Sequence, residues 1–292
     1  MTGVGAVDWR FWLIQTFNGI SYGALLFLLG SGLSLIFGVM RIVNLSHGSY
    51  FLLGGYVALS VILATGSWVL AIPIAALSIA LVGLLMERLF LRRLGFDPLR
   101  QVLLTVGFAF LFQQAALDIW GGDNKDIVPP ASLTQTTVVG GLHLPGYRVF
   151  MIAMAAAIGL ILWLVMEYTR LGAAVRATVD DAQMARGVGI DTSRISMFIF
   201  ALGAFLAGLG GVIGGGFLGV YPGLDFQILP IAFAVVIIGG MGSLGGAAIG
   251  SLLVGIADNF GKALFPEISY FTLYAPMALI LAVRPTGLFG RE

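Results

Sequence analysis

The sequence predicts an all-α fold, a polytopic membrane helical bundle with about eight or nine transmembrane segments, including short broken helices near residues 239–246. Hydrophobic residues make up 59% of the chain and charged residues 10%, whereas soluble domains carry about 25% charged residues. The mean hydropathy is +1.02. Long runs without Asp, Glu, Lys or Arg recur along the chain, at 11–40, 42–86, 101–117, 149–166, 195–224, 226–257 and 268–283.

These runs fix the expected organisation of the chain. Each can hold at least one helix across about 30 Å of hydrocarbon at about 1.5 Å per residue, and the two longest can hold two. The longest polar interval, 118–148, contains Pro129 and Pro130 and leaves no room for a soluble domain. Residues 1–292 are therefore expected to form a single transmembrane domain.

The first half of the chain divides at polar signals. We expect one long tilted helix over 11–40, although two short helices meeting at Gly30 are an alternative. Residues 41–49 then interrupt the apolar pattern, where Asn44 or Ser46 can cap the next helix. A turn is expected at 65–67 and a helix start at Pro98.

The arginines predict the orientation of the helices. Residues 87–100 carry four of the 15 lysines and arginines and are therefore assigned to the cytoplasm, since basic residues accumulate in cytoplasmic loops. Counting spans from there places the N-terminus and the 118–148 loop outside and residues 167–194 inside. The arginine balance also places the C-terminus inside, which requires two short helices in 228–260. These meet at a glycine elbow, and its glycines are Gly239, Gly240, Gly242, Gly245 and Gly246.

The polar segment at about 167–194 is expected to be a structured cytoplasmic loop. Its helical period predicts one amphipathic helix over 174–188, with Val175, Val179 and Ala182 on the apolar stripe. Gly189 is expected to end it in a left-handed cap, and Asp191 or Thr192 to start the next helix. Such a loop favours a protein partner, and a solvated loop lying on lipid headgroups is the alternative. The candidate contact residues are Val175, Arg176, Val179, Asp180, Ala182, Arg186 and Gly189.

The composition excludes several classes of function. A net charge of +1 gives no indication of a nucleic-acid ligand, and the absence of cysteine excludes disulfides and thiol chemistry. The two histidines fall on different predicted sides, so no metal site is expected. No catalytic constellation and no phosphate-binding loop for ATP is present, so the chain is not expected to be an enzyme or to hold a cofactor.

The polar side chains at membrane depth are mostly uncharged, which favours a pathway that passes a solute without binding it tightly. Ion-coupled transport would instead require ionisable residues inside the spans. Each polar side chain taken alone is also compatible with a simple interhelical hydrogen bond. The candidate pathway or gating residues are Asn18, Ser21, Asn44, Ser46, His47, Gln113 and Gln114.

Several motifs together resemble the branched-chain amino acid ABC permeases. The first are FNGISYGA at 17–24 and GVMRIVNLSHG at 38–48, which are similar to the opening signature of the first permease subunit. Three later segments are also similar to the family. Residues 176–190 resemble its cytoplasmic coupling loop, residues 239–247 its glycine-rich region and residues 284–290 its C-terminal motif. Leu45-Ser46 replaces a more usual aromatic-alanine pair, and Ser49 stands where many members have a carboxylate.

This resemblance implies a permease subunit of an ABC importer, which forms half of the translocation pathway and couples to ATPases through the 174–188 helix. The implied partners are a second permease (identical or different), two ATP-binding subunits, a periplasmic or extracellular substrate-binding protein and membrane lipid. The implied location is the cytoplasmic (inner) membrane of a prokaryote. Branched-chain amino acids are the expected solute. Two alternatives remain open: a related importer for urea or amides, and an ATP-independent secondary transporter or channel.

Overall fold

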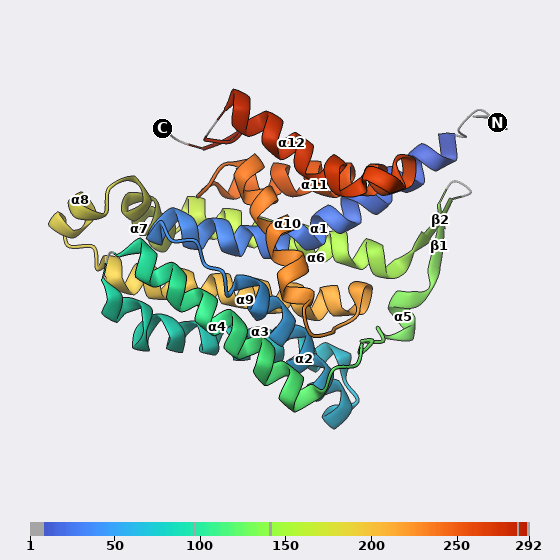
Figure 1. Ribbon diagram of the computed structural model, residues 1–292, viewed down its shortest axis with the longest axis horizontal. Coiled ribbons are helices and arrows are strands. Elements are labelled where there is room, and N and C mark those ends of the chain that lie inside the picture. The colour runs from blue at the N-terminus through green and yellow to red at the C-terminus, as the bar shows by residue number, and fades with distance from the viewer. Residues whose placement is uncertain (1–8, 96, 140–141, 285, 291–292) are drawn as a thin grey trace.

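The computed structural model describes residues 9–95, 97–139, 142–284 and 286–290, and helices dominate it (Figure 1). The longer helices, in chain order, are α1 (Trp9–Met40), α2 (His47–Thr65), α3 (Trp68–Leu89), α4 (Pro98–Trp120), α6 (Gly146–Tyr168), α9 (Thr192–Leu218), α10 (Leu224–Gly239), α11 (Leu244–Leu264) and α12 (Ser269–Val283). The shorter elements are η1 (Leu91–Leu94), α5 (Ala131–Thr134), β1 (Thr136–Val139), β2 (Leu142–Pro145), α7 (Arg170–Asp180), α8 (Ala182–Gly187) and η2 (Pro266–Ile268).

Within the described residues, seven helices are long and apolar enough to cross a membrane, and α10 and the end of α12 are shorter apolar helices. The predicted polytopic bundle is therefore confirmed, and the chain is a multi-pass membrane protein. Helices α1 and α9 form its centre, since 83% and 72% of the residues in their most apolar 18-residue stretches are buried. The corresponding values for α4 and α6 are 17% and 22%, so most of their apolar side chains face outward, as lipid contact requires.

Most of the predicted helix boundaries are confirmed. Residues 9–40 form one helix without a break at Gly30. Gly66 ends α2 with φ +69°, and Asp97 caps α4 by accepting from the backbone N–H of Arg100. The polar interval after α4 contains an unpredicted antiparallel hairpin, in which Thr136 pairs with Pro145. A four-residue strand pair is too short to produce a recognisable alternating pattern.

The first four helices, α1 to α4, and the last four, α9 to α12, pack in corresponding pairs. Helix α1 packs along α11, and α3 packs along α9; α2 contacts α4, and α10 contacts α12. In Figure 1, α1 runs from right to left while α9 runs from left to right. Helices α1 to α4 and α9 to α12 are thus arranged as two repeats of opposite direction, an organisation common in transporters.

The glycine elbow between α10 and α11 is confirmed, and it requires glycine. Gly240 and Gly242 have φ of +102° and +84°. A Cβ on Gly239 would collide with the carbonyl oxygen of Gly246, so no side chain fits between these two helices. The elbow lies beside the end of α1, where Ser34 donates a hydrogen bond to the Ser243 carbonyl oxygen at 3.2 Å.

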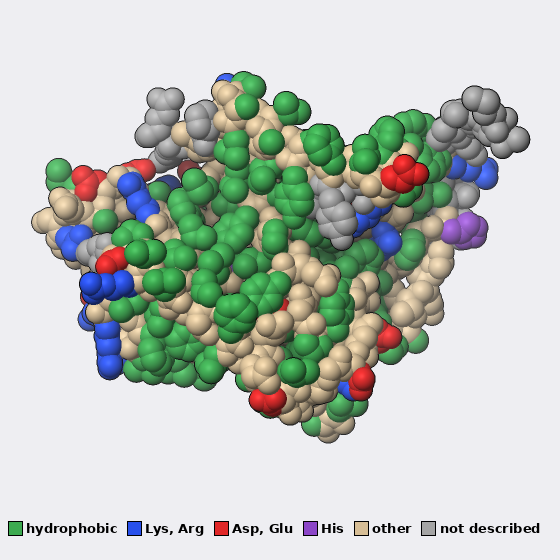
Figure 2. Space-filling view, viewed as in Figure 1, with side chains coloured by type: hydrophobic (Ala, Val, Ile, Leu, Met, Phe, Trp, Pro, Cys, Tyr) green, Lys and Arg blue, Asp and Glu red, His purple; other side chains and the backbone are tan. Residues whose placement is uncertain are grey.

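The two ends of the bundle differ in charge. Lysine and arginine side chains gather at the left end, where α7 and α8 lie, and apolar side chains cover much of the middle (Figure 2). The hairpin β1–β2 lies at the opposite end (Figure 1). This distribution matches the pattern from which the cytoplasmic side was predicted.

Candidate translocation and coupling sites

Two short helices begin inside the bundle and meet there. After α1 ends, Arg41 takes a left-handed φ of +54° and the chain turns back into the protein, so that Ile42 is only 3% exposed. Helix α2 then begins at His47, whose Nε2 lies 3.0 Å from the carbonyl oxygen of Leu29, well before the end of α1. The start of α2 therefore lies in the interior of the bundle.

Asn44 organises the residues that enter α2. Its Oδ1 accepts hydrogen bonds from the backbone N–H of Ser46 at 3.1 Å and from the Ser46 hydroxyl at 2.7 Å. Ser46 occupies the N-cap position, but its hydroxyl makes no cap hydrogen bond, so the predicted capping by Ser46 is wrong, and the side chain that accepts a backbone N–H at this helix entry is that of Asn44. Ser46 has helical backbone angles, φ −79° and ψ 0°, instead of the extended geometry of a side-chain cap.

The start of α10 adds a carboxylate that the sequence interpretation missed. Asp225 is 2% exposed, and its Oδ2 accepts a hydrogen bond from the Ser49 hydroxyl at 2.9 Å. A Cβ on Gly48 would lie 2.5 Å from the Asp225 carbonyl oxygen, so α2 and α10 touch at their first turns. The positive ends of both helix dipoles therefore lie close to this carboxylate.

We call Asn44, Ser46, His47, Ser49 and Asp225 the junction. All five are almost fully buried. Asn44 Nδ2, His47 Nδ1 and Asp225 Oδ1 have no hydrogen-bond partner, although buried polar atoms in proteins are normally paired. The junction thus holds polar capacity that the folded chain alone does not satisfy. The signal that identifies Asp225 is a lone acid directly after the turn at Pro222 and Gly223.

An apolar hollow of about 220 Å³ lies beside the stretch that follows α1. Its walls come from α1, residues 42–43 and α10 with its elbow, and they are Leu33, Phe37, Ile42, Val43, Phe233, Val236, Ile237 and Met241. Val43 and Met241 are 37% and 45% exposed, so part of the wall reaches the protein surface.

The other predicted pathway residues lie elsewhere. Arg148 of α6 donates to Asn18 Oδ1 at 2.6 Å and contacts the Ser21 hydroxyl at 3.5 Å, which joins these residues in a separate cluster. Gln114 lies on the exposed side of α4 and donates to Asp118 at 2.9 Å. Gln113 faces the turn before α10, since its Nε2 is 3.9 Å from where a Cβ of Gly223 would lie. The predicted residues therefore do not form one site.

The coupling segment, residues 169–191, contains two helices instead of the predicted single helix over 174–188. Helix α7 ends at Asp180 and α8 starts at Ala182. The break occurs because Asp181 adopts an extended conformation and its Oδ1 accepts from the backbone N–H groups of Gln183 and Met184, at 2.8 and 2.9 Å. These two hydrogen bonds lower the pKa of the exposed Asp181 carboxyl, with a smaller contribution from the charge of Arg41.

Local caps define every joint of the coupling segment. The Thr169 hydroxyl accepts from the backbone N–H of Gly172 at 3.1 Å and starts α7. Gly189, with φ +91°, ends α8 as predicted, and the backbone N–H of Ile190 donates to the Ala185 carbonyl oxygen at 3.0 Å. Asp191 caps α9 by accepting from the backbone N–H of Arg194 at 3.1 Å. The segment is thus firmly joined to α6 and α9.

The apolar stripe of α7 faces the protein itself, which corrects the expected contact with a partner. Val175 is 3% exposed and packs in a cluster with Leu35, Leu162 and Ile199, and Val179 packs against the same cluster. The large apolar side chains that remain exposed in this segment are Met184 and Val188, at 66% and 72%. The surface available to a partner therefore lies on α8.

The charged residues predicted to take part in coupling also divide into one that contacts the bundle and two that are exposed. Arg176 donates to the carbonyl oxygen of Met166 and lies 3.6 Å from the Glu167 carboxylate, so it anchors α7 to the end of α6. Arg186 is exposed on α8, and its Nε donates to the Ala182 carbonyl oxygen at 3.1 Å. Asp180 is exposed at the end of α7. The roles of these residues in coupling stay predictions.

Membrane-spanning helices, two helices (α2 and α10) that start inside the bundle and a capped segment beyond its end define a membrane transport subunit. The chain belongs to the family described as branched-chain amino acid transport system, permease component, whose sequence profile matches residues 15–281. This confirms the resemblance, and the chain is a transport permease.

Individual relatives cover nearly the whole chain. It is 31% identical to the high-affinity branched-chain amino acid transport system permease protein LivH of Escherichia coli, over 96% of both chains. It is 28% identical to the corresponding protein BraD of Pseudomonas aeruginosa, again over 96% of both. The similarity to LivM of Escherichia coli is 27% identity over 97% of this chain and 72% of LivM. No solved structure was found to match.

Proposed function

We propose that this chain is one of two permease subunits of an ATP-driven importer for branched-chain amino acids in the cytoplasmic (inner) membrane of a prokaryote. Two ATP-binding subunits would hydrolyse ATP, and a substrate-binding protein outside the membrane would deliver the solute. The relatives named as branched-chain amino acid permeases support this solute.

The second permease would be a related but different chain. Both LivH and LivM are named as permeases of a branched-chain amino acid transport system, and this chain is similar to each. The partner would close the apolar hollow beside α1 and α10. A hollow with no polar wall suits an aliphatic side chain, because its burial is favourable by about 25 cal/mol per Å².

The junction would open and close the pathway. It lies where α2 and α10 meet, and one hydrogen bond between Ser49 and Asp225 links the two helices. Movement of either helix would break that link and expose the unpartnered polar atoms to a passing solute. Asn44, Ser46 and His47 would set the position of α2 in this movement. Asn18, Ser21, Gln113 and Gln114 would contribute to the pathway or its support outside the junction.

The capped coupling segment is the observation that carries the ATP-driven mechanism. A segment transmits movement only if it is rigid and firmly joined to the helices that must move. Helix α7 packs into the bundle through Val175, while α8 projects Met184 and Val188 outward. We assign α8 as the element that docks on an ATPase, with Arg186 at the polar edge of the contact.

Substitution of Met184 tests this assignment. We expect Met184→Glu to reduce ATP-driven leucine uptake at least tenfold in vesicles containing both permeases, the ATPases and the binding protein, because it places a charge in an apolar contact. The matched control is Met184→Leu, which keeps the apolar volume and should stay within twofold of the unaltered protein. Normal uptake and normal ATPase retention with Met184→Glu would exclude α8 as the docking element.

A further inference from the structure

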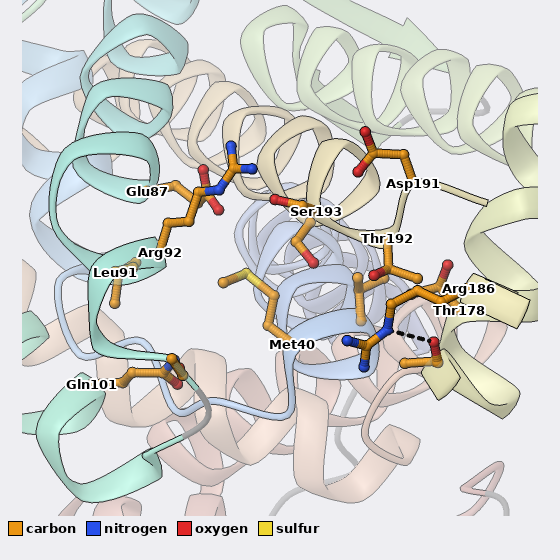
Figure 3. Close-up of a pocket in the computed structure, with 14 residues that line it drawn as sticks. Met40, Glu87, Leu91, Arg92, Gln101, Thr178, Arg186, Asp191, Thr192 and Ser193 are labelled. Atoms are coloured by element: carbon orange, nitrogen blue, oxygen red, sulfur yellow. Dashed lines mark hydrogen bonds between the residues drawn. The ribbon is translucent and has the colours of Figure 1, made fainter. Parts of the chain in front are cut away.

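A cavity of about 350 Å³ opens at the end of the bundle that carries the coupling segment (Figure 3). One wall comes from α3, η1 and the start of α4, and the other from α7, α8 and the start of α9, with the end of α1 between them. The cavity therefore separates the main bundle from the segment proposed to transmit ATPase movement. Its volume is within the range of small-molecule sites in proteins.

The cavity contains a buried carboxylate on which the positive charge of Arg92 acts, but one of its oxygens has no hydrogen-bond partner. Glu87, near the end of α3, is 3% exposed and lines the cavity, and its Oε2 has no hydrogen-bond partner. A buried carboxylate oxygen normally pairs with a donor, since an unpaired one has lost its hydration without replacement. A cationic ligand group, such as an ammonium, would supply the missing hydrogen bond.

The same cavity offers groups for an anion and for an aliphatic chain. Arg92 lines it on the side of Glu87, and Arg186 reaches into it from α8 (Figure 3). Guanidinium groups bind carboxylates through paired hydrogen bonds. Val39, Met40 and Leu91 add apolar surface to the lining. Together these groups match the three parts of a free α-amino acid with an aliphatic side chain.

We propose that this cavity binds a branched-chain amino acid from the cytoplasm and thereby slows import. The identity of the ligand rests on the proposed function, since it would be the transported solute after release. A ligand held by Glu87 and Arg92 on one wall and by Arg186 on the other ties the coupling segment to the bundle. Because it binds one arrangement of these walls better than others, it shifts the population toward a resting state.

The first test measures inhibition by internal leucine. Vesicles containing the complete importer are filled with or without leucine, and the initial rate of ATP-driven uptake is compared for each variant. Internal leucine should lower the uptake rate of the unaltered protein at least fivefold. In Glu87→Gln and Arg92→Gln, the ratio of the uptake rate without internal leucine to the rate with it should fall below twofold. The matched control is Arg93→Gln, because Arg93 is exposed beside Arg92 without lining the cavity. It should keep the fivefold ratio.

Two analogues of leucine test which groups of the ligand the cavity recognises. Leucinamide lacks the carboxylate and 4-methylpentanoate lacks the ammonium, so neither should inhibit from inside as leucine does. Equal inhibition by 4-methylpentanoate would overturn the role of Glu87, and an unchanged ratio in both Glu87→Gln and Arg92→Gln would overturn the site.

A binding measurement separates this inference from the transport function. Equilibrium dialysis of labelled leucine against the permease and ATPase complex, without the binding protein, should show saturable binding that Glu87→Gln weakens at least tenfold. Binding without leucine uptake would contradict the proposed function and leave the site intact. Uptake without such binding would contradict the site alone, as expected if a basic side chain of the ATPase pairs with Glu87 instead.

Discussion

The junction inside the bundle and the coupling segment outside it are both polar interruptions of an apolar chain, but different forces order them. Residues far apart in sequence hold the junction together: Ser49 bonds Asp225, and His47 contacts Leu29. Neighbouring residues define the coupling segment, through caps such as Asp181 and Gly189. Damage to the junction should therefore destabilise the whole bundle, whereas damage to the segment should stay local.

The largest expected effect comes from separating α2 and α10 at the junction. A side chain on Gly48 would collide with the Asp225 carbonyl oxygen, so Gly48→Val should lower the free energy of unfolding by about 3 kcal/mol, at the upper end of overpacking costs. Unfolding of the detergent-solubilised protein by denaturant titration measures this. The control is Gly107→Val in α4, where a Cβ meets no atom within 4 Å. Equal losses for both would show that the junction does not hold the bundle together.

A smaller effect is expected from removing one hydrogen bond of the junction. Ser49→Ala leaves the buried Asp225 carboxylate without its serine donor, which should cost about 1 to 3 kcal/mol in the same titration. The matched control is Ser78→Ala, because the Ser78 hydroxyl only donates to the Ile74 carbonyl oxygen of its own helix, at 2.7 Å. If the two alanine variants are equally stable, the Ser49–Asp225 contact contributes nothing to the junction.

The contrast also explains which features were predictable from sequence. Helix starts at Pro98 and Asp191 and the left-handed end at Gly189 depend on a few adjacent residues, and their patterns predicted them correctly. The predicted contact of Val175 with a partner was wrong, because an apolar stripe does not specify which surface covers it.

Long-range pairing explains the residues that were missed. Asp225 was overlooked because its partner, Ser49, is 176 residues away. Glu87 was grouped with the arginines of a cytoplasmic loop, and only the packing of α3 shows that it is buried. From the sequence, the membrane spans were expected to contain almost no charged residues, so neither buried acid was anticipated.

The smallest expected effect is a local response of the coupling segment to pH. The backbone N–H groups of Met184 and Gln183 bind the ionised Asp181 carboxylate and lower its pKa in the folded protein. The stabilisation of α8 by this charge is therefore complete above the ordinary aspartate value of about 3.9 and is lost as the pH falls through the lower folded value. The start of α8 should loosen only below about pH 4 and stay unchanged between pH 5 and 7.

The methyl NMR signal of Met184 reports this transition, and Asp181→Asn is the matched variant because asparagine caps a helix without a titrating charge. In Asp181→Asn the signal should show no such transition, while stability of the bundle should match the unaltered protein at pH 7. A Met184 transition that persists in Asp181→Asn would mean that another group controls α8 and that the cap at Asp181 does not define this joint.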